Sequence, residues 1–300
     1  MTPISFAECS ARERVARLLD AASFTEWLPP STRVTSPHLA QLGVPSAFDD
    51  GVAVGSGLLD RQRVFIAAQE GEFMGGGVGE VHGAKLVGLL QRALRDKPVA
   101  VLLLAESGGV RLHEANAGLI AVSEVMRAVL DVRAAGIPVV VLIGGANGCF
   151  GGMGIVARCC DYIVMSDIAR LSMSGPEVIE ASNGVEEFDS RDRALVWRTT
   201  GGKHRYLTGD CDALVDDDVQ AFREAAIAAI AMPGGSRPLT LAGLQREHAL
   251  LAQRMSQAPE GADALTLWRA VGVADAARVP DLDAAAVRAL RPAAAAALAA

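Results

Sequence analysis

The sequence predicts an α/β protein in which buried strands alternate with helices on a largely parallel sheet, followed by a helical C-terminal extension. Apolar stretches that begin after Pro98 and Pro138 each run into a glycine pair and then into a helical pattern. Repeated units of this kind are typical of parallel sheets with right-handed crossovers. Hydrophobic residues make up 51% of the chain and aromatic residues only 4%. The core must therefore consist of Ala, Val, Leu and Ile, which suits a parallel sheet covered by helices.

Residues 1–50 are predicted to form a short helix followed by a loop. Ser10 and Glu13 have the spacing of a capping box, and they precede the helical stretch ARERVARLLD. Prolines between residues 29 and 37 then interrupt regular structure. We therefore expect residues 1–50 to form an arm outside the main domain.

Two strands and a glycine cluster open the main domain. Residues 51–69 predict two strands joined by a tight turn. The cluster Gly75, Gly76 and Gly77 follows, and apolar residues at helical spacing predict a helix over residues 78–96.

The strand–glycine–helix unit then recurs twice. The strand after Pro98 precedes a helix over residues 115–135, and the strand after Pro138 precedes a helix that ends near residue 160. Further strands are predicted at 161–165 and 169–172. The glycines between these strands and helices are Gly108, Gly109, Gly151 and Gly152. Functional sites of parallel sheets lie beyond the carboxyl ends of the strands, which is where these glycines fall.

The remainder of the chain is predicted to be helical. Helices are expected at 176–182, 190–199 and 216–231, and the glycine- and proline-rich residues 232–238 form a break before an Ala/Leu-rich tail. The predicted organisation is an arm at 1–50, a main domain at 51–235 and a helical extension at 236–300.

Charge and cysteine content exclude several classes of function. The net charge is −7 and no cluster of Lys or Arg offsets it, which disfavours nucleic acid and anionic membranes as partners. The five cysteines form no CxxC pair, so we expect free thiols and no metal site. The N-terminus has no signal-peptide pattern and no run approaches 18 apolar residues, so we expect a cytoplasmic protein.

The glycine pairs predict an oxyanion hole, because no GxSxG, HExxH or GxxxxGK[ST] motif offers another chemistry. Each pair places N–H groups at a helix start, where they lack intrahelical acceptors and the helix dipole is positive. Glycine leaves these groups uncovered. Two such segments that converge on one oxygen would stabilise an oxyanion, and each donor is typically worth about 10²–10³ in rate. Glycine is common in any such turn, so neither pair is specific alone.

Four segments resemble the carboxyltransferase branch of the crotonase superfamily. CFGGMGIVARCCDYIVMS resembles its Gly-Gly helix start, in which the second glycine, here Gly152, donates an oxyanion-hole N–H. EFMGGGVGEVHGAK resembles the F-x-G-G-S-x-G stretch, with Gly77 where serine is usual, and SGPEVIE matches GP-x-VIE. ESGGVRLHE is similar to the SGGAR-x-x-E motif, with matches at Gly108, Gly109, Arg111 and Glu114. The four lie in the family's order over about residues 51–185.

The resemblance implies a crotonase/ClpP-like fold of repeated ββα units, and three features narrow the family. The chain lacks the four-cysteine zinc ribbon of bacterial acetyl-CoA carboxylase beta subunits. It looks like one half of a fused acyl-CoA carboxyltransferase. Its runs ESGGVRLHEANAGL and GGANGCFGGMG are most similar to the beta subunits of biotin-independent malonate decarboxylases.

That resemblance implies a carboxy-lyase acting on a malonyl thioester. The substrate would be carried by the phosphopantetheine-type (dephospho-CoA-derived) arm of an acyl-carrier subunit, or by CoA, with no biotin and no tightly bound cofactor. A homologous gamma subunit would be the partner. The expected catalytic residues are Gly108, Gly109, Gly151 and Gly152. The expected substrate-binding residues are Gly75, Gly76, Gly77, Ser107, Arg111, His113 and Glu114.

Three alternatives to this function stay open. A carboxyltransferase subunit of a biotin-dependent acyl-CoA carboxylase would use the same glycines, because carboxyl transfer passes through the same enolate. A hydratase or isomerase would require an acidic side chain near Gly152, and the helix MGIVARCC supplies none. A non-catalytic scaffold that completes a partner's site is the third.

The donor of the proton to the enolate is not identified by the sequence. The candidates are His82, His113, Glu106 and Glu114. Arg111 is expected to pair with a carboxylate and brace the turn. Lys85 is expected to be a surface or snorkelling lysine, and Cys149 to be a packed thiol without a catalytic role.

Overall fold

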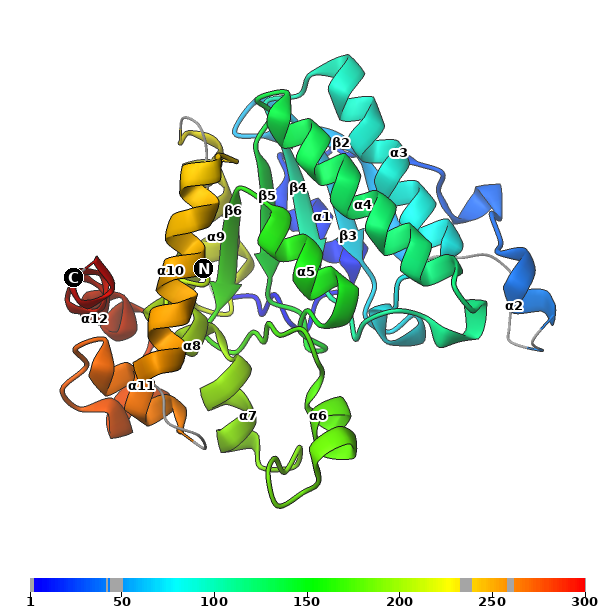
Figure 1. Ribbon diagram of the computed structural model, residues 1–300. Coiled ribbons are helices and arrows are strands. Elements are labelled where there is room, and N and C mark those ends of the chain that lie inside the picture. Colours follow the sequence, from blue (N-terminus) through cyan, green and yellow to red (C-terminus); the bar gives the residue numbers. More distant parts are fainter. Residues whose placement is uncertain (1–2, 42, 44–50, 233–238, 258–261, 300) are drawn as a thin grey trace.

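The computed structural model describes residues 3–41, 43, 51–232, 239–257 and 262–299. It contains a seven-stranded sheet whose strand order follows the sequence, β1-β2-β3-β4-β5-β6-β7 (Figure 1). The first three strands pair antiparallel, and β3 to β7 pair parallel. The strands are β1 (Thr25–Trp27), β2 (Val52–Leu59), β3 (Gln62–Gln69), β4 (Ala100–Ala105), β5 (Val139–Ile143), β6 (Tyr162–Ser166) and β7 (Ala213–Val215).

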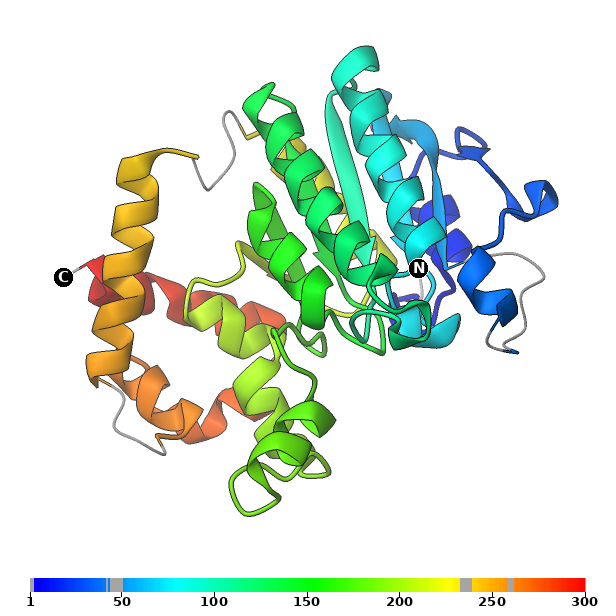
Figure 2. The same cartoon turned by 45° about the vertical axis from the view of Figure 1, so that its right-hand side comes forward.

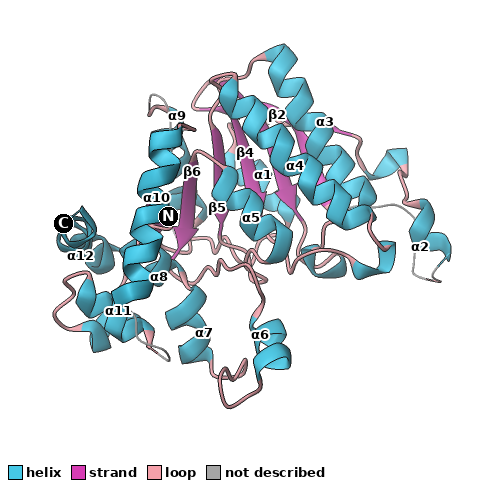
Figure 3. Ribbon diagram, viewed as in Figure 1, coloured by secondary structure: helices cyan, strands magenta, loops and turns pink. Residues whose placement is uncertain are grey.

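Helices cover both faces of the sheet, as Figure 3 shows. In β4, Val101 and Leu103 lie in one hydrophobic core, whereas Leu102 and Leu104 lie in the other, because successive side chains of a strand point to opposite faces. The helices on the first face are α3 (Glu80–Asp96), α4 (Ala117–Ala134) and α5 (Gly151–Cys159). Those on the second face are α1 (Ala11–Leu18) and α9 (Val219–Ile230).

The N-terminal arm packs onto the sheet through α1, which lies against α9. The capping box at Ser10 and Glu13 is present and begins α1, as predicted. The ring of Phe6 stacks on Phe222 of α9 with 4.0 Å between centroids. The rest of the arm includes η1 (Pro30–Thr32) and α2 (Pro37–Gln41). The division into an arm, a main domain and an extension stays a prediction.

Short elements differ from the sequence-based expectations. The strands β1 and β7 were not predicted, because three residues are too few to show the alternation of apolar and polar side chains that indicates a strand. The strand predicted at 169–172 is wrong. Arg170 and Leu171 form only isolated bridges, to Gly201 and Cys149 respectively.

The C-terminal half is helical, as predicted. It contains α6 (Pro176–Asn183), α7 (Arg193–Thr200), α8 (Gly202–Leu207), α10 (Leu241–Gln257), α11 (Ala264–Ala270), η4 (Ala276–Asp281) and α12 (Ala284–Ala299). In Figure 2, α10 stands to one side of the sheet, with α11 and α12 near its lower half. Most of the predicted break at 232–238 lies outside the described residues. No helix in the described ranges is long and apolar enough to cross a membrane.

A buried histidine joins the extension to the main domain. Trp268 of α11 donates its indole N–H to Nδ1 of His204 on α8, at 3.2 Å. Burial, together with the neighbouring charge of Arg205, lowers the pKa of His204 from 6.5 to about 3. His204 must therefore stay neutral in the folded protein.

This pKa predicts a loss of stability in mild acid. The folded-state pKa lies below the unfolded value, so the stabilisation is complete above pH 6.5 and is lost as the pH falls toward 3. Between pH 7.5 and 5.5 we expect the wild type to lose about 1 kcal/mol more unfolding free energy than His204→Gln does. Urea titrations of both proteins at the two pH values measure this difference. Equal losses would contradict the assignment.

Candidate active site

Three glycine segments meet at the carboxyl ends of β3, β4 and β5. The N–H of Gly108 donates to the carbonyl oxygen of Gly75 at 2.8 Å, which joins the segment after β3 to the segment after β4. The N–H of Phe150 donates to the carbonyl oxygen of Ser107 at 2.8 Å, which joins the segments after β4 and β5. The structure thus brings together the glycines that the sequence singled out.

The segments after β4 and β5 touch at two glycines. Gly151 has a φ of +58°, and a Cβ placed on it would lie 2.9 Å from the Cα of Gly109. Gly109 itself has a φ of +135°. Glycine is required at this contact, because a side chain on Gly151 would be strained and would push the two backbones apart.

Three of the four predicted glycine N–H groups are engaged within the protein. Gly108 donates to Gly75, as described above, and Gly109 donates to Oγ of Ser107 at 3.2 Å. Gly151 donates to the carbonyl oxygen of Met173 at 2.9 Å. These bonds fix the shapes of the turns, so the three groups are poorly placed to bind a ligand at the same time.

Two other N–H groups have no acceptor among the described residues, those of Gly152 and Val110. Gly152 lies in the first turn of α5, where helical N–H groups lack intrahelical partners. Val78 and Val110 form an isolated parallel bridge. The N–H of Val78 donates to the carbonyl oxygen of Gly109, and the carbonyl oxygen of Val78 accepts the N–H of Arg111. In this pairing the N–H of Val110 points away from Val78. The nitrogen of Val110 lies 4.0 Å from the position of a Cβ on Gly151.

Val110 was missed by sequence reasoning. Its side chain carries no chemistry, and the direction of its N–H depends on pairing with Val78 across 32 positions of chain. The motif itself could have pointed to it, since Val110 directly follows the Gly108–Gly109 pair.

Arg111 and Glu114 are buried beneath these turns. The guanidinium of Arg111 donates to the carbonyl oxygen of Gly77 at 2.7 Å and pairs with Glu114 at 3.5 Å. Glu114 also accepts the N–H of Glu80, at 2.5 Å. Arg111 lies over the ring of Phe73. The pair braces the turn, as expected for Arg111, and direct contact with substrate stays a prediction for both residues.

The four candidate proton donors lie in different environments. His113 is exposed on η3 (Leu112–Glu114), beside the glycine turns. His82 is fully buried and hydrogen-bonds the Gln69 amide at 2.9 Å. Glu106 is buried and forms an ion pair with Arg14 of α1. Glu114 is buried, pairs with Arg111 and accepts the N–H of Glu80.

Two other side chains near the site contribute to packing. The expectation of a surface or snorkelling lysine at 85 is wrong: Lys85 is 5% exposed and its ammonium donates to the carbonyl oxygen of Val52 at 2.7 Å. Cys149 is fully buried, and burial raises the pKa of its thiol to about 12, which fits a packing role. The described residues include no group of three or more His, Cys, Asp or Glu placed to hold a metal ion.

The parallel sheet and the glycine turns in contact beyond β4 and β5 are the features that the resemblance to crotonase-like carboxyltransferases led us to expect. Residues 7–241 match the family model for the carboxyl transferase domain. The chain belongs to the carboxyl transferase domain family.

Within that family the chain is similar to proteins that process malonyl groups. A malonyl-S-ACP:biotin-protein carboxyltransferase from Malonomonas rubra is 46% identical over 243 residues, which are 76% of each chain. A chain of a Pseudomonas malonate decarboxylase hetero-tetramer, solved in complex with malonate, is 42% identical with a TM-score of 0.82. The match covers 89% of this chain and 97% of that one.

A chain of a Pseudomonas malonate decarboxylase hetero-dimer is 40% identical, with a TM-score of 0.67 and coverage of 83% of this chain and 96% of that chain. A transcarboxylase 12S chain is 26% identical with a TM-score of 0.63, covering 75% of this chain and 42% of that one. The predicted crotonase-like fold and the resemblance to malonate decarboxylases are confirmed by these matches.

Proposed function

We propose that this chain is the beta subunit of a biotin-independent malonate decarboxylase, which converts a malonyl thioester into an acetyl thioester and CO₂. The observation that carries the proposal is the pair of N–H groups on Val110 and Gly152, which border the contact between Gly109 and Gly151. The similarity to chains of Pseudomonas malonate decarboxylase supports the choice of substrate.

The reaction needs an oxyanion site above all. Loss of CO₂ breaks the bond between C2 and the carboxylate carbon, and the electron pair forms an enolate whose charge lies on the thioester oxygen. Two fixed N–H donors and the positive end of α5 stabilise that charge where it develops. C2 must then take up a proton. His113 is the first donor to test, because its side chain is exposed beside the turns while His82, Glu106 and Glu114 are buried.

The substrate would be carried on the phosphopantetheine-type arm of an acyl-carrier subunit, or on CoA, in the cytoplasm. A homologous gamma subunit would complete the site from outside. The hetero-tetramer and hetero-dimer of Pseudomonas malonate decarboxylase support a partner subunit for this chain. Gly75, Gly76, Gly77 and Ser107 would then form the wall of the site next to the thioester.

Carboxyl transfer to a biotin protein is the second candidate. The 46% identity to the Malonomonas rubra carboxyltransferase favours it specifically. The transfer would pass through the same enolate, so the same two N–H groups would serve both reactions. The two functions differ in what accepts the carboxyl group.

The test is an assay of the chain co-purified with its candidate gamma subunit. We expect CO₂ release from malonyl-CoA or a malonylated carrier protein that requires both subunits and is unaffected by avidin. Each subunit alone is the control. Release that stops when avidin is added, or carboxyl transfer to a supplied biotin protein without free CO₂, would contradict the decarboxylase and establish the transferase.

A further inference from the structure

Glu106 lies where the glycine segments of the candidate active site begin. It directly follows β4 and precedes Ser107, which opens the turn that contains Gly108 and Gly109. Only 4% of Glu106 is exposed. A carboxylate that has lost its hydration must find partners inside the protein. The groups that bond to Glu106 therefore show what this side chain holds together.

The two carboxylate oxygens of Glu106 bond to different parts of the fold. Oε2 pairs with the guanidinium of Arg14 on α1, which packs on the second face of the sheet. Oε1 accepts the backbone N–H of Asn147, in the segment after β5, at 3.1 Å. The side-chain amide of Asn147 donates to the carbonyl oxygen of Gly71, after β3, at 2.8 Å. One carboxylate thus connects α1 with the segments after β3, β4 and β5.

Two glycines leave a slot that the carboxylate of Glu106 fills. A Cβ on Gly71 would lie 2.4 Å from Cδ of Glu106, and a Cβ on Gly145 would lie 2.3 Å from it. A side chain at either glycine would therefore displace the carboxylate. Groups in such close contact have little freedom to move, because protein interiors are tightly packed. The fit of Glu106 in this slot fixes the position of Asn147 relative to β4.

The bond from Glu106 to Asn147 is one of three hydrogen bonds that join the segment after β4 to the segment after β5. The other two connect backbone groups. The N–H of Ser107 donates to the carbonyl oxygen of Gly148, and the carbonyl oxygen of Ser107 accepts the N–H of Phe150, both at 2.8 Å. The carboxylate thus adds a side-chain link to a short backbone pairing.

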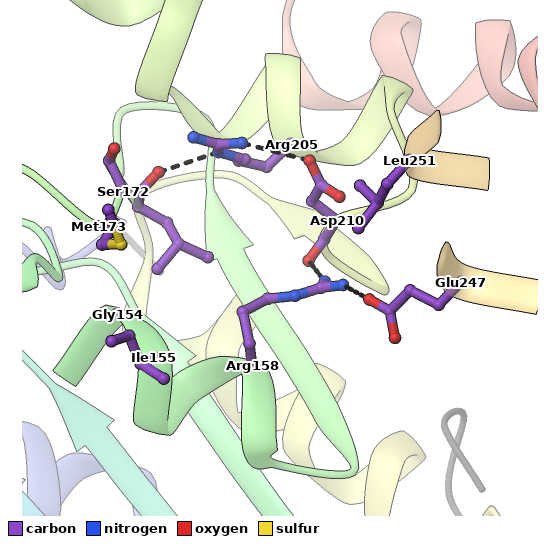
Figure 4. Close-up of a pocket in the computed structure, with 10 residues that line it drawn as sticks. Gly154, Ile155, Arg158, Ser172, Met173, Arg205, Asp210, Glu247 and Leu251 are labelled. Carbon is purple, nitrogen blue, oxygen red and sulfur yellow. Dashed lines mark hydrogen bonds and ion pairs between the residues drawn. The ribbon is translucent and has the colours of Figure 1, made fainter. Parts of the chain in front are cut away.

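The turn after β5 is also bonded to residues 171–173, independently of Glu106. The N–H of Gly151 donates to the carbonyl oxygen of Met173 at 2.9 Å. Arg205 of α8 supports the same segment by donating to the carbonyl oxygen of Leu171 at 2.9 Å (Figure 4). These bonds fix the turn to its later neighbours in the chain, whereas Glu106 fixes it to β4.

The two N–H groups that the proposed function requires follow directly after this junction. Val110 lies four positions after Glu106, and Gly152 lies five positions after Asn147. Donors stabilise an oxyanion efficiently when they are fixed before the charge develops. A misplacement of about 1 Å can cost about 10²-fold in rate, even when its cause lies away from the reacting atoms. A carboxylate that holds the junction can therefore affect the rate without touching the substrate.

We propose that Glu106 is a positioning residue: its carboxylate, held by Arg14, sets the spacing between the turns that carry the N–H groups of Val110 and Gly152. This inference rests on the oxyanion role in the proposed function, and it applies equally to decarboxylation and carboxyl transfer, since both pass through the enolate. It replaces the role of proton donor for Glu106, because a carboxylate paired with a guanidinium acts as an acceptor. It also makes α1 part of the support of the site.

The test compares glutamine with alanine at position 106 in the assembled complex, after the partner charge has been removed. Arg14→Met/Glu106→Gln keeps an oxygen for the N–H of Asn147 and fills the slot, whereas Arg14→Met/Glu106→Ala does neither. We expect the alanine variant to lower kcat about 10-fold or more with KM within about 2-fold of the wild type, and the glutamine variant to recover most of that loss. A proton donor would behave differently: glutamine has no acidic proton, so both variants would be equally slow.

Two further variants separate positioning from a general loss of packing. Leu102→Ala, in the same strand and fully buried in the core of the second face, should lower the unfolding free energy and leave kcat unchanged. Asn147→Ala changes a half-buried residue and removes the bond to Gly71. It keeps the backbone N–H that Glu106 accepts, so we expect a smaller loss of kcat, about 3- to 10-fold.

Hydrogen exchange supplies a measurement that needs no activity. Residues 107–111 and 147–152 should exchange faster in the alanine double variant than in the glutamine double variant, relative to residues 124–134 of α4 in the same molecule. Equal kcat values in the two double variants, or equal exchange in these segments, would overturn the positioning role. A wild-type complex with neither CO₂ release nor carboxyl transfer would reject the proposed function, and the exchange result would still decide the role of Glu106.

Discussion

Gly151→Ala is expected to lower the rate of thioester decarboxylation about 10²-fold or more, with a cost of about 1–2 kcal/mol in unfolding free energy. The new Cβ would lie 2.9 Å from the Cα of Gly109, so the turns after β4 and β5 must separate. The N–H groups of Gly152 and Val110 belong to these two turns, and oxyanion stabilisation depends on their fixed spacing. The measurement is kcat for the assembled complex, alongside urea unfolding.

Gly136→Ala is the matched control. Gly136 has a φ of +79°, comparable to the +58° of Gly151, but a Cβ there meets no atom within 4 Å. It follows α4, before β5 and so at the opposite end of that strand from the turns. Both substitutions should cost about 1–2 kcal/mol of backbone strain, and only Gly151→Ala should lose activity. Equal activity in the two variants would rule out an oxyanion role for these turns.

Arg14→Met is expected to lower the unfolding free energy by about 3–5 kcal/mol, because it leaves Glu106 charged and unpaired in the interior. The side chains of Arg14 and Glu106 are 2% and 6% exposed. Arg14 also donates to the carbonyl oxygens of Phe6 and Ala7, and Glu106 accepts the N–H of Asn147 at 3.1 Å. This one pair therefore joins α1 to the ends of β4 and β5.

Denaturant unfolding of Arg14→Met, compared with Arg127→Met in the exposed pair on α4, measures the effect. The exposed pair should contribute no more than about 1 kcal/mol. The double variant Arg14→Met/Glu106→Gln should recover part of the loss, since it no longer buries an uncompensated charge. A loss in Arg14→Met no larger than that in Arg127→Met would show that the buried pair is not a major source of stability.

The parts of the fold that the sequence predicted are those set by local patterns. Strands β2 to β6 of the sheet, the capping box at Ser10 and the glycine turns all follow from residues close together in the chain. The parts that it missed depend on distant partners. Lys85 reaches a backbone oxygen of β2, and no helical periodicity can show that. Arg14 and Glu106 meet across 92 positions.

The candidate site was predictable in location and less so in detail. The Gly-Gly pairs correctly marked the ends of β4 and β5, because glycine is needed where backbones touch. Which N–H groups remain available could not be predicted, since Gly108, Gly109 and Gly151 are engaged by Gly75, Ser107 and Met173 from elsewhere in the fold. The N–H of Val110, directly after the Gly108–Gly109 pair, has no acceptor among the described residues, whereas the N–H groups of both glycines are already bonded.

The strand order has a consequence for how the chain assembles during synthesis. Each strand from β2 to β7 adds to the edge formed by the strand before it, so the sheet can grow from the ribosome without waiting for distant sequence. The second face is different. Phe6 and α1 are covered by α9, more than 200 residues later, and the N–H of Ile4 bonds the Asp218 side chain. A nascent chain released before α9 emerges would carry a nearly complete sheet whose second face is covered only by α1, and the part that α9 covers would be a natural substrate for a chaperone.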